Sequence, residues 1–266
     1  MITRIITALV GLPIFIGLLY KGVYYTQILV LAMVYAGISE IINILKIKNK
    51  SIVFSLFIFS AITIFPPDFL LTFETAMLFM LTLFIIFIKD FTHNNEENKE
   101  KFITTIKGLF IYFYVTLSFY HLVLLRNMDD GFKYIFFMFI IIWVTDSFAY
   151  FTGMAFGKNK LAPSISPKKT IEGSVGGSLS AVIISLFINH QYGIFPNVSI
   201  WVLSLVILSL TVVSQLGDLF ESSIKRIYNV KDSGKILPGH GGVLDRFDST
   251  IFVAPVFYVL LKFLII

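Results

Sequence analysis

Cysteine is absent from this 266-residue sequence. Its absence excludes disulfide bonds, metal sites with thiolate ligands and cysteine nucleophiles. Charge is also scarce, because Asp, Glu, Lys and Arg make up 14% of the residues, against about 25% in typical soluble domains. No long polar region is present to form a separate soluble domain. The chain is therefore expected to fold in a membrane.

What the sequence has in abundance is apolar residues, at 57% of the total and a mean hydropathy of +0.87. A helix needs about 20 apolar residues to span a bilayer, and helices satisfy their own backbone hydrogen bonds in lipid. The sequence predicts an all-α polytopic integral membrane protein with about nine spans, folded as one transmembrane domain over residues 1–266. The apolar runs lie at 4–20, 24–45, 51–65, 69–88, 106–125, 133–153, 173–190, 199–219 and 249–266.

Lysines and arginines are distributed unevenly between the connections. If the N-terminus is cytoplasmic, most basic residues fall on the cytoplasmic side, whereas Lys21, Arg126 and Lys133 fall on the other. The positive-inside rule favours this orientation. The net charge of +5 is then explained by topology, and nucleic acid is not an expected partner. The polar segment 92–101 is expected to be a solvated loop.

Two polar blocks stand out in the second half of the chain, at 145–173 and 214–248, both on the predicted cytoplasmic side. In the second block, helical spacing places four polar side chains on one face. Asp245 and Asp248 would share a face at the start of the last helix, and a glycine-rich stretch precedes them. Carboxylates beside cations and glycine backbone are suited to a magnesium–polyphosphate complex. The four residues on the common face are Asp218, Glu221, Ser222 and Lys225.

Simpler explanations exist for each part of these blocks. Asp245 and Asp248 would stabilise a helix N-terminus without any ligand, and the pair Lys168 and Lys169 would also serve orientation or contact with anionic lipid. G-x-x-x-G spacings at Gly153/Gly157 and Gly173/Gly177 favour close helix packing. Asp146 lies inside an apolar run, where a charge costs about 2.5–3.5 kcal/mol, so it should face the protein interior or a cavity.

Glu40 is a second acidic residue inside an apolar run, at 24–45. The sequence supports two interpretations equally, a partner for a cation of either polar block and a structural hydrogen-bond acceptor. His240 stands between glycines in the second block. For this histidine, ordering of the loop is at least as well supported as proton transfer.

The second block resembles the C-terminal motif of the phosphatidate cytidylyltransferases, also called CDP-diacylglycerol synthases. The first block resembles the other polar region of that family, with D-S-F-A-Y at 146–150 and S-P-K-K-T-x-E-G at 166–173. The long fixed spacing is far more specific than a single glycine motif. The motif positions of the second block are Ser222, Lys225, Arg226, Lys231, Asp232, Gly234, Pro238, His240, Gly241, Gly242, Asp245, Arg246 and Asp248. The likeness covers residues 140–266, whereas residues 1–130 share little more than hydropathy.

The resemblance implies a homodimer in the inner (plasma) membrane of a bacterium that converts CTP and phosphatidic acid to CDP-diacylglycerol and pyrophosphate. It implies a divalent cation such as Mg²⁺ held by Asp218, Asp245 and Asp248, and leaves open whether a monovalent cation joins it. The implied catalytic residues are Asp218, Lys225, Arg226, Asp245, Arg246 and Asp248. The implied substrate-binding residues are Asp146, Ser166, Lys168, Lys169, Thr170, Glu172, Ser222, Lys231, Asp232, His240, Gly241 and Gly242.

Two other functions remain open from the residues. A transporter or channel would use Asp146 and Glu40 as ion-relay groups, but it predicts polar residues at mid-depth in several spans. A related lipid-phosphate enzyme, such as a polyprenol kinase or a CDP-archaeol synthase, would keep the nucleotide and metal and change the acceptor lipid.

Overall fold

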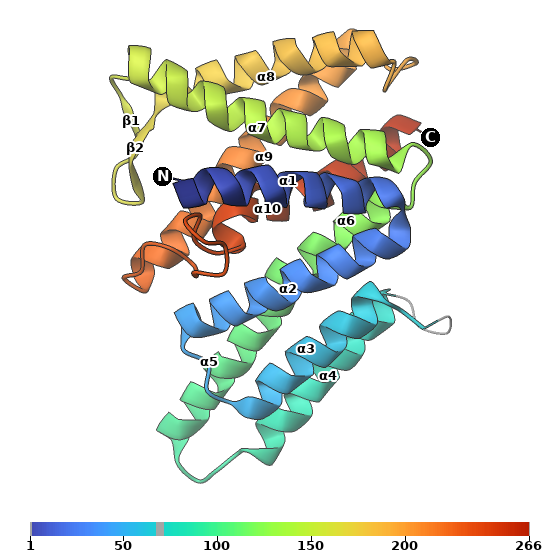
Figure 1. The fold of residues 1–266 in the computed structure, drawn as a ribbon. Coiled ribbons are helices and arrows are strands. Elements are labelled where there is room, and N and C mark those ends of the chain that lie inside the picture. The colour runs from blue at the N-terminus through green and yellow to red at the C-terminus, as the bar shows by residue number, and fades with distance from the viewer. Residues whose placement is uncertain (1, 68–71, 266) are drawn as a thin grey trace. The chain divides into compact units, whose positions relative to one another are not determined.

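The computed structural model describes residues 2–67 and 72–265, and the chain is almost entirely helical there. A single two-stranded hairpin of β1 (Lys160–Ala162) and β2 (Ser166–Thr170) is the exception among the described residues (Figure 1). The helical elements are α1 (Ile2–Lys21), α2 (Val23–Leu45), α3 (Lys50–Ile64), α4 (Thr72–Lys89), α5 (Asn95–Ile111), the π-helical segment η1 (Tyr112–Leu117), α6 (Ser118–Arg126), α7 (Gly131–Phe156), α8 (Ile171–Tyr192), α9 (Ile200–Ile227) and α10 (Leu244–Ile265).

The predicted class, an all-α polytopic membrane protein, is confirmed. Seven helical stretches in the described part of the chain are long and apolar enough to cross a bilayer, with α5, η1 and α6 counted as one. The described apolar part of α1 (Leu9–Lys21) and α3 are shorter. Each predicted span coincides with a helix, but nine full-length crossings stay a prediction.

The chain folds into two compact units, which are described separately. The first contains Met1–Val123 and Asp232–Leu244. In this unit, α3 packs against α2 and α4, and α4 packs against α5 (Figure 1). Its core is apolar, and two pairs of buried hydroxyls lie at hydrogen-bond distance in it: the oxygens of Ser60 and Thr116 lie 2.7 Å apart, and those of Thr63 and Tyr112 lie 2.6 Å apart. These four buried hydroxyls thus satisfy one another inside the unit.

The second unit contains Leu124–Lys231 and Asp245–Ile266. Figure 1 shows α7 and α8 running side by side, and α9 contacts both. A Cβ added to Gly173 would lie 2.6 Å from the Ala149 carbonyl oxygen, and one added to Gly177 would lie 2.5 Å from that of Thr145. The predicted close packing at this G-x-x-x-G spacing is confirmed for α8 against α7. The prediction of one domain over the whole chain stays a prediction.

Replacing Gly177 by Leu should separate α7 from α8, because a side chain has no space beside the backbone of α7. We expect a loss of at least about 1–3 kcal/mol of stability, the range for overpacking a filled core. Thermal unfolding in detergent would measure it. Gly17→Ala is a matched control, since a Cβ there meets nothing within 4 Å. An unchanged unfolding midpoint for Gly177→Leu would contradict the packing argument.

Two local features differ from the sequence-based expectation. The polar segment 92–101, predicted to be a loop, contains the start of α5, where the Asn94 side chain accepts hydrogen bonds from the backbone N–H groups of Glu96 and Glu97. An Asn cap with acidic residues in the first turn favours helix even in a polar segment. The hairpin β1–β2 was not predicted either, because its strands are too short and polar to alternate visibly.

Candidate active site

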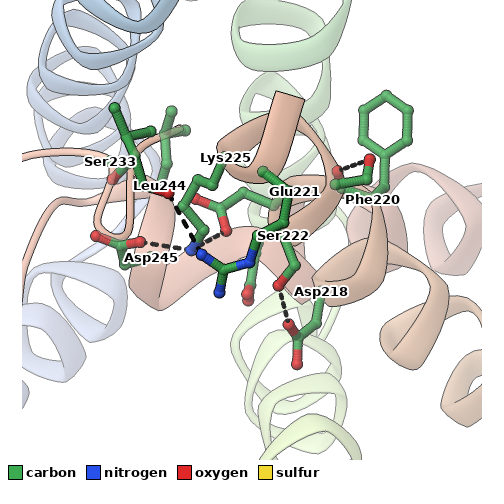
Figure 2. A network of polar contacts seen from close by, with 12 residues as sticks. Asp218, Phe220, Glu221, Ser222, Lys225, Ser233, Leu244 and Asp245 are labelled. Carbon is green, nitrogen blue, oxygen red and sulfur yellow. Dashed lines mark hydrogen bonds and ion pairs between the residues drawn. The ribbon is translucent and has the colours of Figure 1, made fainter. Parts of the chain in front are cut away.

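The residues of the second polar block that belong to α9 form one polar face near the end of this helix. The Asp218 carboxylate accepts a hydrogen bond from the Ser222 hydroxyl at 3.3 Å, and the Lys225 ammonium forms an ion pair with Glu221 (Figure 2). These pairs are four residues apart, so they follow directly from the helical repeat. The prediction that Asp218, Glu221, Ser222 and Lys225 share a face is confirmed.

Lys225 joins α9 to the start of α10. Its Nζ donates to Oδ1 of Asp245 at 2.7 Å, and Figure 2 shows the ammonium between Asp245 and Glu221. The Lys225 side chain is 12% exposed, and those of Glu221 and Asp245 are 3% and 8% exposed. Neither Glu221 oxygen has a hydrogen bond of normal geometry, although the ammonium lies against one of them. The site therefore holds two buried carboxylates around one cation.

Asp248 brings a further carboxylate to the same place. The backbones of α9 and α10 approach so closely that a Cβ added to Gly217 would lie 2.9 Å from the Asp248 carbonyl oxygen. The Ser249 hydroxyl donates to the Ser214 carbonyl at 3.0 Å. Asp248 interacts electrostatically with Asp218, Glu221 and Asp146. Acidic groups from two separate stretches of sequence thus meet, as the spacing predicted.

The hairpin β1–β2 places a second lysine on this acidic cluster. Lys169, on β2, forms an ion pair with Oδ2 of Asp218. Asp146, on α7, interacts electrostatically with both members of that pair. Asp146 is nevertheless exposed, so its predicted position facing the protein interior or a cavity stays a prediction. The neighbouring Lys168 is exposed, and Ser166 begins the strand half-buried.

Other predicted site residues fix the hairpin itself. The Glu172 carboxylate accepts hydrogen bonds from the backbone N–H groups of Lys158 (3.1 Å) and Asn159 (3.1 Å) and from the Asn159 amide (2.7 Å). The buried Thr170 hydroxyl accepts from the N–H of Gly173 and caps α8. Arg226 donates to the Ile165 carbonyl in the β1–β2 turn at 3.3 Å. In this structure the side chains of Glu172 and Thr170 accept hydrogen bonds from backbone N–H groups. Their predicted contacts with substrate stay predictions.

The resemblance implies a divalent cation at the acidic cluster. Among residues 2–67 and 72–265, no group of three His, Asp or Glu side chains is arranged to hold a metal ion. Lysine ammonium groups lie against the carboxylates instead. The donor set nevertheless fits a hard cation, since it offers carboxylate oxygens only, and both buried Glu221 oxygens lack a normal hydrogen bond. Binding of Mg²⁺ by Asp218, Asp245 and Asp248 therefore stays a prediction.

The predicted residues of the second block from Asp232 to Gly242 belong to the first unit. They form a glycine-rich loop, defined here as residues 232–243, in which Gly239 and Gly241 have φ of 76° and 88°. Only glycine adopts such angles at little cost. The backbone N–H of His240 donates to the Leu237 carbonyl at 2.9 Å. The backbone N–H of Leu237 donates to the Gly241 carbonyl at 2.9 Å. Asp232 is exposed at the start of the loop, and Lys231 is exposed before it.

Glu40 contacts this loop. Its buried carboxylate accepts hydrogen bonds from the Ser233 hydroxyl and the N–H groups of Val243 and Leu244. Of the two interpretations left open by the sequence, the structural acceptor is the one observed. Ser233 was not singled out from the sequence, and Glu221 was placed on the common face of the second block without an assigned role. A charge inside an apolar run is a detectable signal, as for Glu40, whereas nothing in the sequence distinguishes Ser233 from other serines.

Comparison with known proteins gives a decisive result. The family model described as "Cytidylyltransferase family" matches residues 2–264. The chain belongs to the cytidylyltransferase family. It is 38% identical to the phosphatidate cytidylyltransferase of Bacillus subtilis over 97% of this chain and 96% of that protein. It is 36% identical to the phosphatidate cytidylyltransferase of Staphylococcus saprophyticus over 97% of this chain and 98% of that protein.

The match extends through both halves of this member of the cytidylyltransferase family. Residues 1–130, which show little motif, are therefore as much part of the family fold as the polar blocks. Family membership agrees with the resemblance read from the motifs. It also explains why the acidic cluster and the glycine-rich loop occur together in one chain.

Proposed function

We propose that this protein transfers CMP from CTP to phosphatidic acid, giving CDP-diacylglycerol and pyrophosphate for phospholipid synthesis. The observation that carries the proposal is the nearly full-length identity to proteins named phosphatidate cytidylyltransferase. Seven helical stretches in the described part of the chain are long and apolar enough to cross a bilayer, which agrees with a diacyl lipid as substrate.

The reaction joins two polyanions, so charge repulsion and alignment form much of its barrier. A phosphate oxygen of phosphatidic acid attacks the α-phosphorus of CTP. A new P–O bond forms, the bond from the α-phosphorus to the bridging oxygen breaks, and pyrophosphate leaves with that electron pair. The lipid phosphate is already ionised at neutral pH, so a strong general base is unnecessary. This agrees with the sequence of the second block, where ordering of the loop by His240 is at least as well supported as proton transfer.

Lysines and arginines of the second unit are proposed to bind the phosphates. Lys225 and Lys169 already lie against carboxylates, and they are close enough to the acidic cluster to exchange that partner for a phosphate oxygen. The exposed Lys168, Arg226, Lys231 and Arg246 are proposed to contribute the remaining contacts. A divalent cation bound by Asp218, Asp245 and Asp248 would neutralise charge on the triphosphate.

We further propose that the site faces the cytoplasm, where CTP is made, in the inner membrane of a bacterium. The uneven distribution of lysines and arginines supports this orientation. A homodimer is implied by the resemblance alone. Light scattering of the purified protein in detergent would test it.

The proposal predicts a specific product. Purified protein given CTP, phosphatidic acid and Mg²⁺ should form CDP-diacylglycerol and pyrophosphate in equal amounts, and chelation of the cation should stop the reaction. Replacing phosphatidic acid by an isoprenoid phosphate or alcohol tests the related lipid-phosphate enzymes. Pyrophosphate release without a lipid nucleotide would contradict the assignment. Ion flux in liposomes that does not depend on CTP would favour a transporter, although the polar groups gather in few places rather than along several spans.

A further inference from the structure

The carboxylate of Glu40 is bound entirely by hydrogen-bond donors of a distant stretch of sequence. Oε1 accepts from the Val243 N–H at 2.8 Å, and Oε2 accepts from the Leu244 N–H at 3.0 Å and the Ser233 hydroxyl at 2.9 Å. The Glu40 side chain is buried, with 3% exposure. These donors lie about 200 residues away in sequence, at both ends of the glycine-rich loop. The Glu40 side chain on α2 therefore links the two ends of the glycine-rich loop.

The loop is shaped around this carboxylate. A Cβ added to Gly234 would lie 2.8 Å from Cγ of Glu40, and one added to Gly242 would overlap the Ser233 hydroxyl and Oε2 of Glu40. One turn earlier on α2, a Cβ added to Gly37 would lie 3.1 Å from Cδ2 of Leu244. Small residues on both sides thus allow the loop and α2 to come together. The glycines of the loop leave space for a side chain of the length and shape of Glu at position 40.

The chemistry of the three donors requires an acceptor with no hydrogens. The N–H groups of Val243 and Leu244 lie at the N-terminus of α10, where backbone N–H groups have no partner within the helix and a negative charge is favourable. A Gln side chain has the same shape, but its NH₂ group must face either the Val243 N–H or the Leu244 N–H. In both orientations one buried backbone N–H loses its partner. Glu40→Gln is therefore a nearly isosteric change that removes only the acceptor.

We propose that Glu40 is a positioning residue, which fixes the glycine-rich loop in the shape that binds CTP. This inference rests on the proposed function, because it assumes that His240, Gly241 and Gly242 of the loop contact the nucleotide. The neighbour of Leu244 in the chain is Asp245, so the same two hydrogen bonds also fix the backbone that leads into a proposed metal ligand. Glu40 itself does not touch substrate.

Steady-state kinetics of Glu40→Gln separate positioning from folding. We expect the KM for CTP to rise by about 10-fold, the factor for losing one hydrogen bond to a charged group, while the KM for phosphatidic acid changes less than about two-fold. Ser233→Ala removes one donor and should raise the KM for CTP by about three-fold. In the double variant, the KM for CTP should rise by less than the product of the two single-variant factors, because both side chains belong to one hydrogen-bond network.

Ser60→Ala is the matched control for Ser233→Ala. Both serines are buried in the first unit and each makes a side-chain hydrogen bond, but Ser60 pairs with Thr116. It should lower the unfolding temperature in detergent to a similar extent and leave both KM values unchanged. Equal rises of both KM values in Glu40→Gln, or no rise for CTP, would overturn the proposal. If Glu40→Gln does not fold, an unchanged KM for CTP in Ser233→Ala would overturn it.

Assays of the wild-type protein distinguish a failure of the proposed function from a failure of the proposed role of Glu40. Wild-type protein that forms no CDP-diacylglycerol would contradict the proposed function and, with it, the role of Glu40. Wild-type protein that forms this product, together with unaltered CTP kinetics in the variants, would contradict the role of Glu40 alone.

Discussion

Replacing Asp245 by Asn is expected to lower the rate of CDP-diacylglycerol formation by about 10³-fold or more while the protein remains folded. Asp245 is buried at the start of α10 and accepts a hydrogen bond from Lys225 at 2.7 Å. Asn keeps the size and one acceptor oxygen but removes the negative charge. A loss of that size equals about 4 kcal/mol of transition-state stabilisation, within the range for removing a charged group that organises a metal or oxyanion.

Incorporation of labelled CMP from CTP into lipid would measure this rate. Asp130→Asn is the matched control, because Asp130 also pairs with a lysine, Lys133 at 2.8 Å, but is 58% exposed. We expect wild-type activity from it. Thermal unfolding and size-exclusion chromatography in detergent check the fold of both variants. An Asp245→Asn enzyme that retains a tenth of wild-type activity would remove Asp245 from the proposed metal site.

The acidic cluster could be predicted from sequence because its spacing is helical. Asp218, Glu221, Ser222 and Lys225 recur at three and four residues, which places them on one face of any helix. Asp245 and Asp248 follow the same rule in α10. The close approach of Gly217 to Asp248 could not be derived from this periodicity, since contacts between helices depend on the packing of all their side chains.

Long-range polar contacts were the hardest to predict. The sequence marked Glu40 as exceptional, because a carboxylate inside an apolar run is costly, but it could not identify donors about 200 residues away. The hairpin was missed for a different reason. Its strands have three and five residues, and the Glu172 carboxylate binds the backbone N–H groups of the two residues just before β1. The pairing of Lys169 with Asp218 depends on that hairpin.

Replacing Lys225 by Met is expected to destabilise the protein by roughly 3–5 kcal/mol and to abolish activity. The side chain is 12% exposed and lies between Glu221 and Asp245. Removing one member of a buried ion pair leaves the other charges without compensation, and this costs more than the pair contributes while intact. Here two neighbouring carboxylates, one of them only 3% exposed, would repel each other in a site of low polarity.

Adding Glu221→Gln to this variant separates stability from catalysis. The second change removes one of the two buried negative charges, so it should restore much of the lost stability, as neutral replacements of buried ion pairs often do. Activity should stay lost, because the proposed phosphate contact of Lys225 is still missing. Lys133→Met, which breaks an exposed pair, should change the unfolding free energy by less than about 1 kcal/mol. If the double variant regains activity, Lys225 serves only to balance charge and does not bind substrate.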